Sequence, residues 1–150
     1  MQQLKQKVIS YYKQQVQDRE DAFRDMITAL TEDAANDAKG SAGDKHETAL
    51  SMMHLEQEKL NAKLTVIVQQ KAFLNKIDAD AVHTKITVGS LVKANTMYLF
   101  MSLALPKITV DGNTIIALSP QSPLGAKIMG LEKGDSFEIS GKEYIIEDIV

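Results

Sequence analysis

The stretch LSMMHLEQEKLNAKLTVIVQQKAFL, residues 50–74, repeats apolar side chains at alternating steps of three and four residues. That spacing is the heptad pattern of a helix that packs along one face against another helix. Two polar residues, Gln57 and Lys71, interrupt the repeat. The seam positions predicted from this stretch are Leu50, Met53, Gln57, Leu60, Leu64, Ile67, Lys71 and Leu74.

The chain before this stretch supplies a partner for it. Residues 1–32 also carry apolar side chains at helical spacing, and the Gly-containing segment 39–43 separates the two patterns. Each helix would run for about 30 residues, or about 45 Å. A short turn between two such helices predicts an antiparallel pair, since neither helix buries its stripe alone. The predicted apolar face of the first helix is Leu4, Val8, Tyr12, Val16, Phe23, Met26, Ile27 and Leu30.

The composition changes near residue 79. All three Pro and six of the eight Gly lie beyond this point, and Ile, Val and Thr begin to alternate with polar residues. Alternation of this kind is typical of strands, and the triplet Asp111-Gly112-Asn113 between two such segments indicates a tight hairpin. We expect about five strands, over residues 85–92, 97–105, 107–118 as a hairpin, 136–139 and 143–149.

One short helix is predicted within this second half. Ser122 is a suitable N-cap, Pro123 suits the first helical position, and Gly130 suits the end. The sequence therefore predicts an α+β chain of two domains. Residues 1–78 form an antiparallel α-helical coiled-coil hairpin, and residues 79–150 form a small antiparallel β-sheet domain with one short helix.

Composition narrows the classes of function. The chain has no Cys, so disulfides, thiolate metal sites and Cys nucleophiles are excluded. A formal net charge of −3 argues against tight non-specific binding to nucleic acid. No apolar run is long enough to span a membrane and no signal-peptide pattern is present, so we expect a cytoplasmic protein with no membrane partner. The sequence contains no P-loop, no nucleophile elbow and no dinucleotide fingerprint. It therefore carries none of these signs of an enzyme that acts alone.

Two carboxylates stand at the turn of the predicted hairpin. Asp44 and Glu47 are three residues apart, which is the spacing of a capping box at a helix start. The same pair could help to hold Mg²⁺, which prefers oxygen ligands and is often bound by one or two carboxylates plus groups from another molecule. The two roles are compatible, because the helix dipole favours carboxylates there. We expect His46 to be an exposed turn residue, with a proton shuttle or a metal contact as the alternative, and Lys45 could contact a phosphate or balance charge.

The pattern resembles the Gre transcript-cleavage factors of bacterial RNA polymerase. The resemblance covers nearly the whole chain in architecture, and its most specific part is the run Ser122-Pro123-Leu124-Gly125 with Gly130 and Gly134-Asp135. Family members that cleave RNA carry an Asp and a Glu at i and i+3 after a Gly, as Gly43, Asp44 and Glu47 do here. The resemblance implies an FKBP-like fold for the second domain.

The resemblance also implies a function. The hairpin would enter the secondary channel of RNA polymerase, where Asp44 and Glu47 would retain a shared Mg²⁺ and stimulate the polymerase's own cleavage of backtracked RNA. The nascent RNA 3′ end would be contacted indirectly, and the factor would act as a monomer without enzymatic activity of its own. The docking loop would fall at residues 102–106, where the family often has acidic residues and this chain has Leu103, Leu105 and Pro106. These three are the predicted partner-binding residues.

Other functions fit parts of the pattern. A relative that occupies the same channel without cleavage would act as a transcription regulator or inhibitor. A prolyl isomerase would need an aromatic-lined pocket, and the second half has only Tyr98, Phe100, Phe137 and Tyr144 and no Trp. A passive coiled-coil scaffold would tolerate replacement of Asp44 and Glu47.

Overall fold

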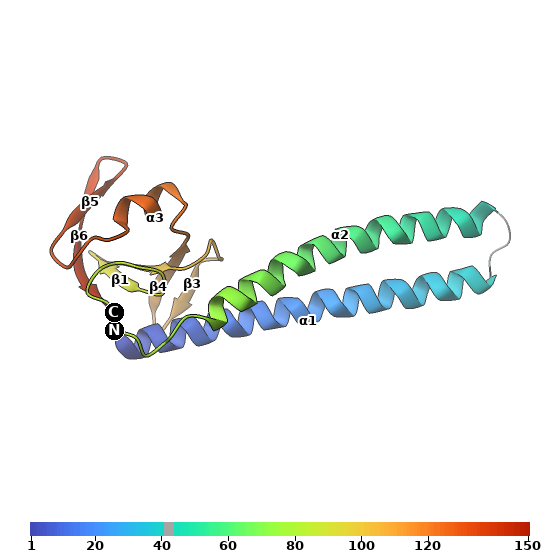
Figure 1. Cartoon of the computed structure of the whole chain (residues 1–150), viewed down its shortest axis with the longest axis horizontal. Helices are drawn as coiled ribbons and strands as arrows, with labels where there is room; N and C mark the ends of the chain where they lie inside the picture. The colour runs from blue at the N-terminus through green and yellow to red at the C-terminus, as the bar shows by residue number, and fades with distance from the viewer. Residues whose placement is uncertain (41–43) are drawn as a thin grey trace. The chain divides into compact units, whose positions relative to one another are not determined.

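The structure, a computed structural model, describes the backbone of residues 1–40 and 44–150 and the side chains of residues 1–36 and 47–150. Two long helices come first, followed by strands and one short helix (Figure 1). The elements are α1 (Gln2–Gly40), α2 (Asp44–Asn75), β1 (Leu91–Ala94), β2 (Met97–Met101), β3 (Ile108–Val110), β4 (Asn113–Leu118), α3 (Pro123–Ile128), β5 (Ser136–Ile139) and β6 (Lys142–Ile149).

The chain divides into two compact units. One unit comprises Met1–Tyr12 together with Leu74–Val150, and the other comprises Lys13–Phe73. The first turns of α1 therefore belong to the same unit as the strands. The predicted single boundary near residue 79 stays a prediction.

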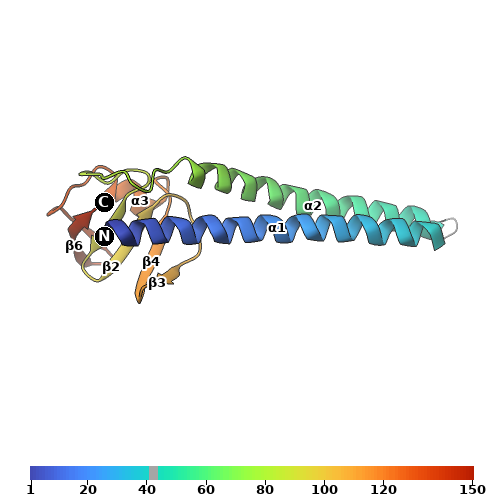
Figure 2. The same ribbon diagram turned by 90° about the horizontal axis from the view of Figure 1, so that it is seen from below.

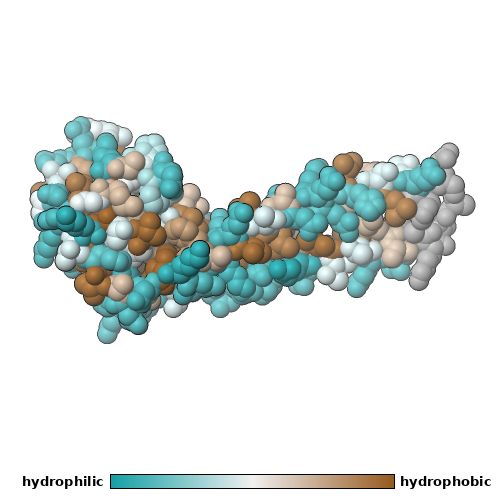
Figure 3. All heavy atoms as spheres, in the orientation of Figure 1, coloured by the Kyte–Doolittle hydropathy of each residue, from teal (hydrophilic) through white to brown (hydrophobic). Residues whose placement is uncertain are grey.

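The hairpin unit is a pair of antiparallel helices, with α1 and α2 side by side in both views (Figures 1 and 2). All eight predicted seam positions of α2 are buried or half-buried, and its other positions are mostly exposed. Apolar atoms follow the line between the helices (Figure 3). The heptad prediction for α2 is confirmed. None of the described helices is both long and apolar enough to cross a membrane.

The seam of α1 differs from its prediction at two positions. Met26 is 50% exposed, whereas Glu20, which was not predicted, is only 7% exposed. A strict alternation of four and three residues explains both results, because it passes through Glu20 and Ile27 and leaves Met26 one residue off the seam. The α1 seam in this unit is Val16, Glu20, Phe23, Ile27, Leu30 and Ala34.

The sheet has six strands in the order β3-β4-β2-β1-β6-β5. β2 pairs with β4 in parallel, and every other neighbouring pair is antiparallel. The predicted fold class, a small antiparallel β-sheet domain with one short helix, is therefore confirmed, although the sheet has six strands where about five were expected and includes one parallel pair. The chain leaves β2 and makes the β3–β4 hairpin before it returns, so β4 runs in the same direction as β2.

The predicted strand over residues 85–92 was also misplaced. β1 begins only at Leu91, and residue 85 forms an isolated bridge with Glu132. Gly89 has a φ of +93°, a left-handed conformation that ends any extended run before β1. The predicted strand over 97–105 likewise ends early, at Met101.

The tight turn predicted at Asp111-Gly112-Asn113 is present, and a second turn of the same kind joins β5 to β6. Asp111 and Gly112 have φ values of 51° and 78°, and Ser140 and Gly141 have values of 51° and 82°. Positive φ at both central residues is the mark of the two-residue turns that suit the twist of a hairpin. These turns fix the registers of β3 with β4 and of β5 with β6.

Side chains on both faces of the sheet are buried. On one face, Ile128 of α3 joins an apolar cluster with residues such as Val92 and Leu99. On the other face, Tyr12 of α1 stacks on Phe100 with ring centroids 6.0 Å apart. Because Leu99 and Phe100 are adjacent in β2, their side chains point to opposite faces. The start of α1 therefore completes the core of this unit.

Candidate functional site

The predicted acidic pair lies at the start of α2. Asp44 is the first residue of this helix, and Glu47 follows three residues later. Positions three apart are neighbours on a helix surface. The Glu47 side chain is exposed. The side chains of Asp44, Lys45 and His46 lie outside the described residues, so the predicted capping box and the separation of the two carboxylates stay predictions.

The side chains near the turn can be compared with the ligands that the predicted magnesium ion would need. Within residues 1–36 and 47–150, no group of three or more His, Asp or Glu side chains could hold a metal. Asp44 and Glu47 provide carboxylate oxygens, the ligand type that Mg²⁺ prefers. Two carboxylates suit an ion that takes its remaining ligands from water and from another molecule. Asp44 and Glu47 therefore fit an ion that is shared with another molecule.

Polar side chains link the two helices of the hairpin. Glu20 accepts a hydrogen bond from Lys71 at 3.1 Å and a second from Arg24 at 3.3 Å. The hydrogen bond from Lys71, followed by its charge, holds the pKa of Glu20 below its usual value. Gln57 donates to the hydroxyl of Thr31 at 2.9 Å. Both residues that interrupt the α2 heptad are therefore paired with α1.

The residues of the Ser-Pro run build the start of α3. The Ser122 hydroxyl accepts a 3.0 Å hydrogen bond from the Gly125 amide, and Pro123 is the first helical residue. A Cβ on Gly125 would lie 1.9 Å from the backbone oxygen of Ser119, so only glycine fits there. Downstream, Asp135 accepts a bond from the Glu132 amide and Gly134 has a φ of +93°. Within this chain these residues hold local structure.

The predicted docking residues differ in exposure. Leu105 is only 8% exposed, Leu103 is half-buried and Pro106 is exposed. The backbone oxygen of Pro106 accepts a 2.7 Å hydrogen bond from the Tyr12 hydroxyl. Pro106 therefore offers the most surface of the three, and their role in docking stays a prediction.

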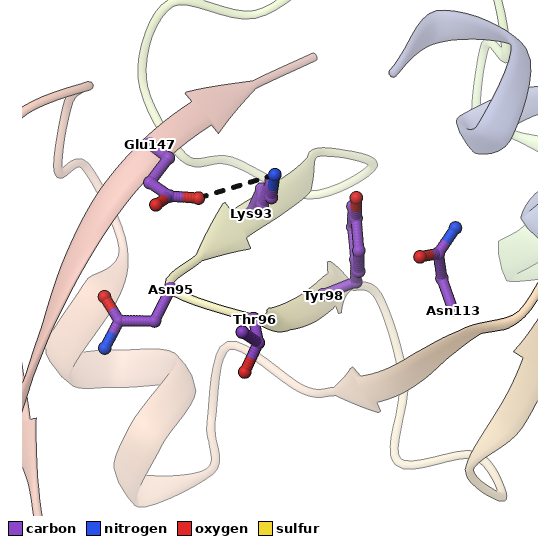
Figure 4. A pocket seen from close by; sticks show the side chains of 6 residues that line it. All are labelled: Lys93, Asn95, Thr96, Tyr98, Asn113 and Glu147. Carbon is purple, nitrogen blue, oxygen red and sulfur yellow. Dashed lines mark ion pairs between the residues drawn. The ribbon is translucent and has the colours of Figure 1, made fainter.

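A polar hollow that the sequence did not reveal lies on the sheet (Figure 4). Its volume is about 560 Å³. Lys93 and Glu147, on the neighbouring strands β1 and β6, form an ion pair at 3.6 Å on one side of it. Asn95 has a structural role, since its side-chain oxygen accepts a hydrogen bond from the Ile145 amide. Four of the lining residues lie within positions 93–98, but two come from distant strands, so no local pattern predicts the hollow: Lys93, Asn95, Thr96, Tyr98, Asn113 and Glu147.

A Ser–His pair lies between α2 and β1 in the sequence. The Nδ1 atom of His83 is 3.1 Å from the hydroxyl of Ser90. Ser90 is completely buried, and its hydroxyl also accepts a bond from the Thr87 amide. A nucleophile must reach its substrate, so this pair is structural. Burial is the main cause that lowers the pKa of His83, and the charge of Lys5 lowers it further.

Comparisons with known proteins add little beyond this geometry. No protein-family model and no curated protein matches the chain. Among solved structures, the transcription factor Gfh1 is similar at 16% sequence identity and a TM-score of 0.36. That alignment covers 91% of this chain and 92% of the Gfh1 chain. Likeness at this level assigns neither a family nor a function.

Proposed function

We propose that the chain is a Gre-like transcription factor that binds RNA polymerase and stimulates cleavage of backtracked RNA. The observation that carries the proposal is the position of the acidic pair at the turn of an antiparallel hairpin. α2 begins at Asp44, and Glu47 is exposed one turn later. The Ser-Pro run and the Gly134-Asp135 turn of the other unit support the same assignment through their resemblance to the Gre factors.

The chemistry would take place in the active centre of the polymerase. A Mg²⁺ ion held there would supply an activated water and charge stabilisation for phosphoryl transfer. Asp44 and Glu47 would supply carboxylate oxygens to that ion and accept hydrogen bonds from its waters, which orients them. The chain would contribute ligands and positioning, while the polymerase contributes the remaining ligands and the substrate.

A cleavage assay on backtracked elongation complexes tests the proposal. With Mg²⁺ present, wild-type protein should release RNA 3′ fragments. The variant Asp44→Asn/Glu47→Gln should lose at least about tenfold of that activity, as metal-site substitutions typically do. Glu56→Gln/Glu58→Gln is the matched control, because both residues are exposed carboxylates of α2. Equal activity of the two variants would contradict the proposal.

A second candidate is a polymerase-binding regulator without cleavage activity. A regulator of this class would also carry carboxylates at the turn of the hairpin, so Asp44 and Glu47 do not by themselves separate the two candidates. The same assay separates the candidates, since a regulator would slow elongation without releasing any 3′ fragment.

A further inference from the structure

The seam of the hairpin contains a charged pair where apolar contacts would be expected. Glu20 occupies a seam position of α1 and is only 7% exposed. Its carboxylate is 3.1 Å from Lys71, which occupies a seam position of α2, and 3.3 Å from Arg24 on its own helix. A cross-helix ion pair within a largely apolar seam is a known device for specifying how helices align.

Apolar contacts alone do not determine the alignment of this hairpin. A heptad repeat places similar residues opposite one another after a slip of seven residues. A slip in one direction would bring Leu64 into the place of Lys71 beside Glu20, and would bring Lys71 beside Lys13. A slip in the other direction would bring Lys71 beside Ile27. Each slip separates Glu20, whose side chain is only 9% exposed, from its cross-helix partner Lys71, and that is unfavourable.

We propose that Glu20 and Lys71 are positioning residues that select the axial register of the hairpin and thereby fix where Glu47 stands along α1. The second polar contact, between Gln57 and Thr31, belongs to the same alignment of the helices. The register is a property of the hairpin alone. Its consequence for cleavage rests on the proposed function.

Disulfide trapping reads the register directly, because the chain has no Cys of its own. Thr31→Cys/Gln57→Cys reports the observed register, since these two side chains are in contact. Thr31→Cys/Leu50→Cys and Thr31→Cys/Leu64→Cys report slips of seven residues in the two directions. Each pair is oxidised in the otherwise wild-type chain and in a chain that also carries Glu20→Leu/Lys71→Leu.

In the wild-type background we expect a disulfide from the Thr31/Gln57 pair and almost none from the other two. With Glu20→Leu/Lys71→Leu, at least one displaced disulfide should increase by about tenfold or more, because the unpaired charge that opposes slipping is gone. Arg24→Gln is the control, since it removes only the partner on the same helix, and it should leave the disulfide pattern unchanged. Circular dichroism should show equal helix content in all variants.

The two proposals can fail separately. An unchanged disulfide pattern in Glu20→Leu/Lys71→Leu would overturn the positioning role, whatever the cleavage assay shows. If the wild-type chain releases no RNA, the proposed function fails and the disulfides still decide the register. If the register shifts, cleavage stimulation should fall in the same variant, and unchanged stimulation would refute the link between register and Glu47.

Discussion

Tyr12 is completely buried, and its hydroxyl donates a 2.7 Å hydrogen bond to the backbone oxygen of Pro106. Burial, with a smaller contribution from Tyr11, raises the pKa of Tyr12 to about 12. We predict that Tyr12→Phe lowers the free energy of unfolding by about 1 kcal/mol, since it leaves the Pro106 oxygen without its donor. Urea denaturation measures the change. Tyr11→Phe, at a position that is 48% exposed, should have almost no effect.

His83 makes the stability of its unit depend on pH. Burial and the charge of Lys5 lower its pKa, while a bond with the Val150 backbone and the charge of Asp78 act in the opposite direction. The unfolded chain therefore takes up a proton at His83 before the folded chain does. The stabilisation is complete above the usual pKa of 6.5 and is lost as the pH falls below it.

The measurement is urea denaturation at pH values of about 7.5 and about 5.5. We expect wild-type protein to lose stability at the lower pH and His83→Gln to lose less. His54→Gln, at an exposed position of α2, should behave as wild type. A drop in stability that is identical in all three proteins would refute the assignment to His83.

The burial of Glu20 could not be predicted from the sequence. Met26 was placed in the seam because it is apolar, and Glu20 was left out because it is charged. The helical repeat determines which of the two residues lies in the seam. The ion pairs with Lys71 and Arg24 stabilise the Glu20 carboxylate there. The partner Lys71 lies 51 residues away in the sequence, so no local signal announces the pair.

At the scale of an element, α3 depends on one close approach. The Cβ of an alanine at position 125 would lie 1.9 Å from the Ser119 oxygen, which is backbone and cannot rotate away. We predict that Gly125→Ala destabilises the unit by about 3 kcal/mol, in spite of the better helix propensity of alanine. Ala126→Gly, at the exposed neighbour, should cost about 1 kcal/mol. Thermal unfolding of both variants provides the comparison, and a smaller effect for Gly125→Ala would contradict it.

Helices and turns could be predicted where the residues that determine them lie close together in the sequence. The seam of α2, the two tight turns and the capped helix α3 each follow from residues close together in the sequence. The parallel pairing of β2 with β4 depends on a partner reached only after another strand, and was missed. The start of β1 was misplaced because alternation continues through residues 85–90, where the left-handed Gly89 excludes a strand.

At the scale of the whole molecule, the chain joins a helical hairpin to a small mixed-sheet unit that includes the first turns of α1. The fold class followed from the change of composition near residue 79. The acidic pair is a prediction from its spacing and its place between the two helical patterns, whereas the polar hollow around Lys93 and Tyr98 was not foreseen, because its residues gather from four strands and a turn.

The central claim is that the turn of the hairpin enters the active centre of RNA polymerase. Since the chain has no Cys, Glu47→Cys gives a unique attachment point for an iron chelate that generates hydroxyl radicals. The conjugate is added to backtracked elongation complexes, and the cut sites in the polymerase are mapped. A conjugate at Glu143→Cys, an exposed position of the other unit, is the control. We expect the Glu47 conjugate to cut the segments that surround the catalytic Mg²⁺, and the Glu143 conjugate not to cut them. Cuts confined to the outer surface of the polymerase, or no cuts in a complex that contains the bound conjugate, would contradict it.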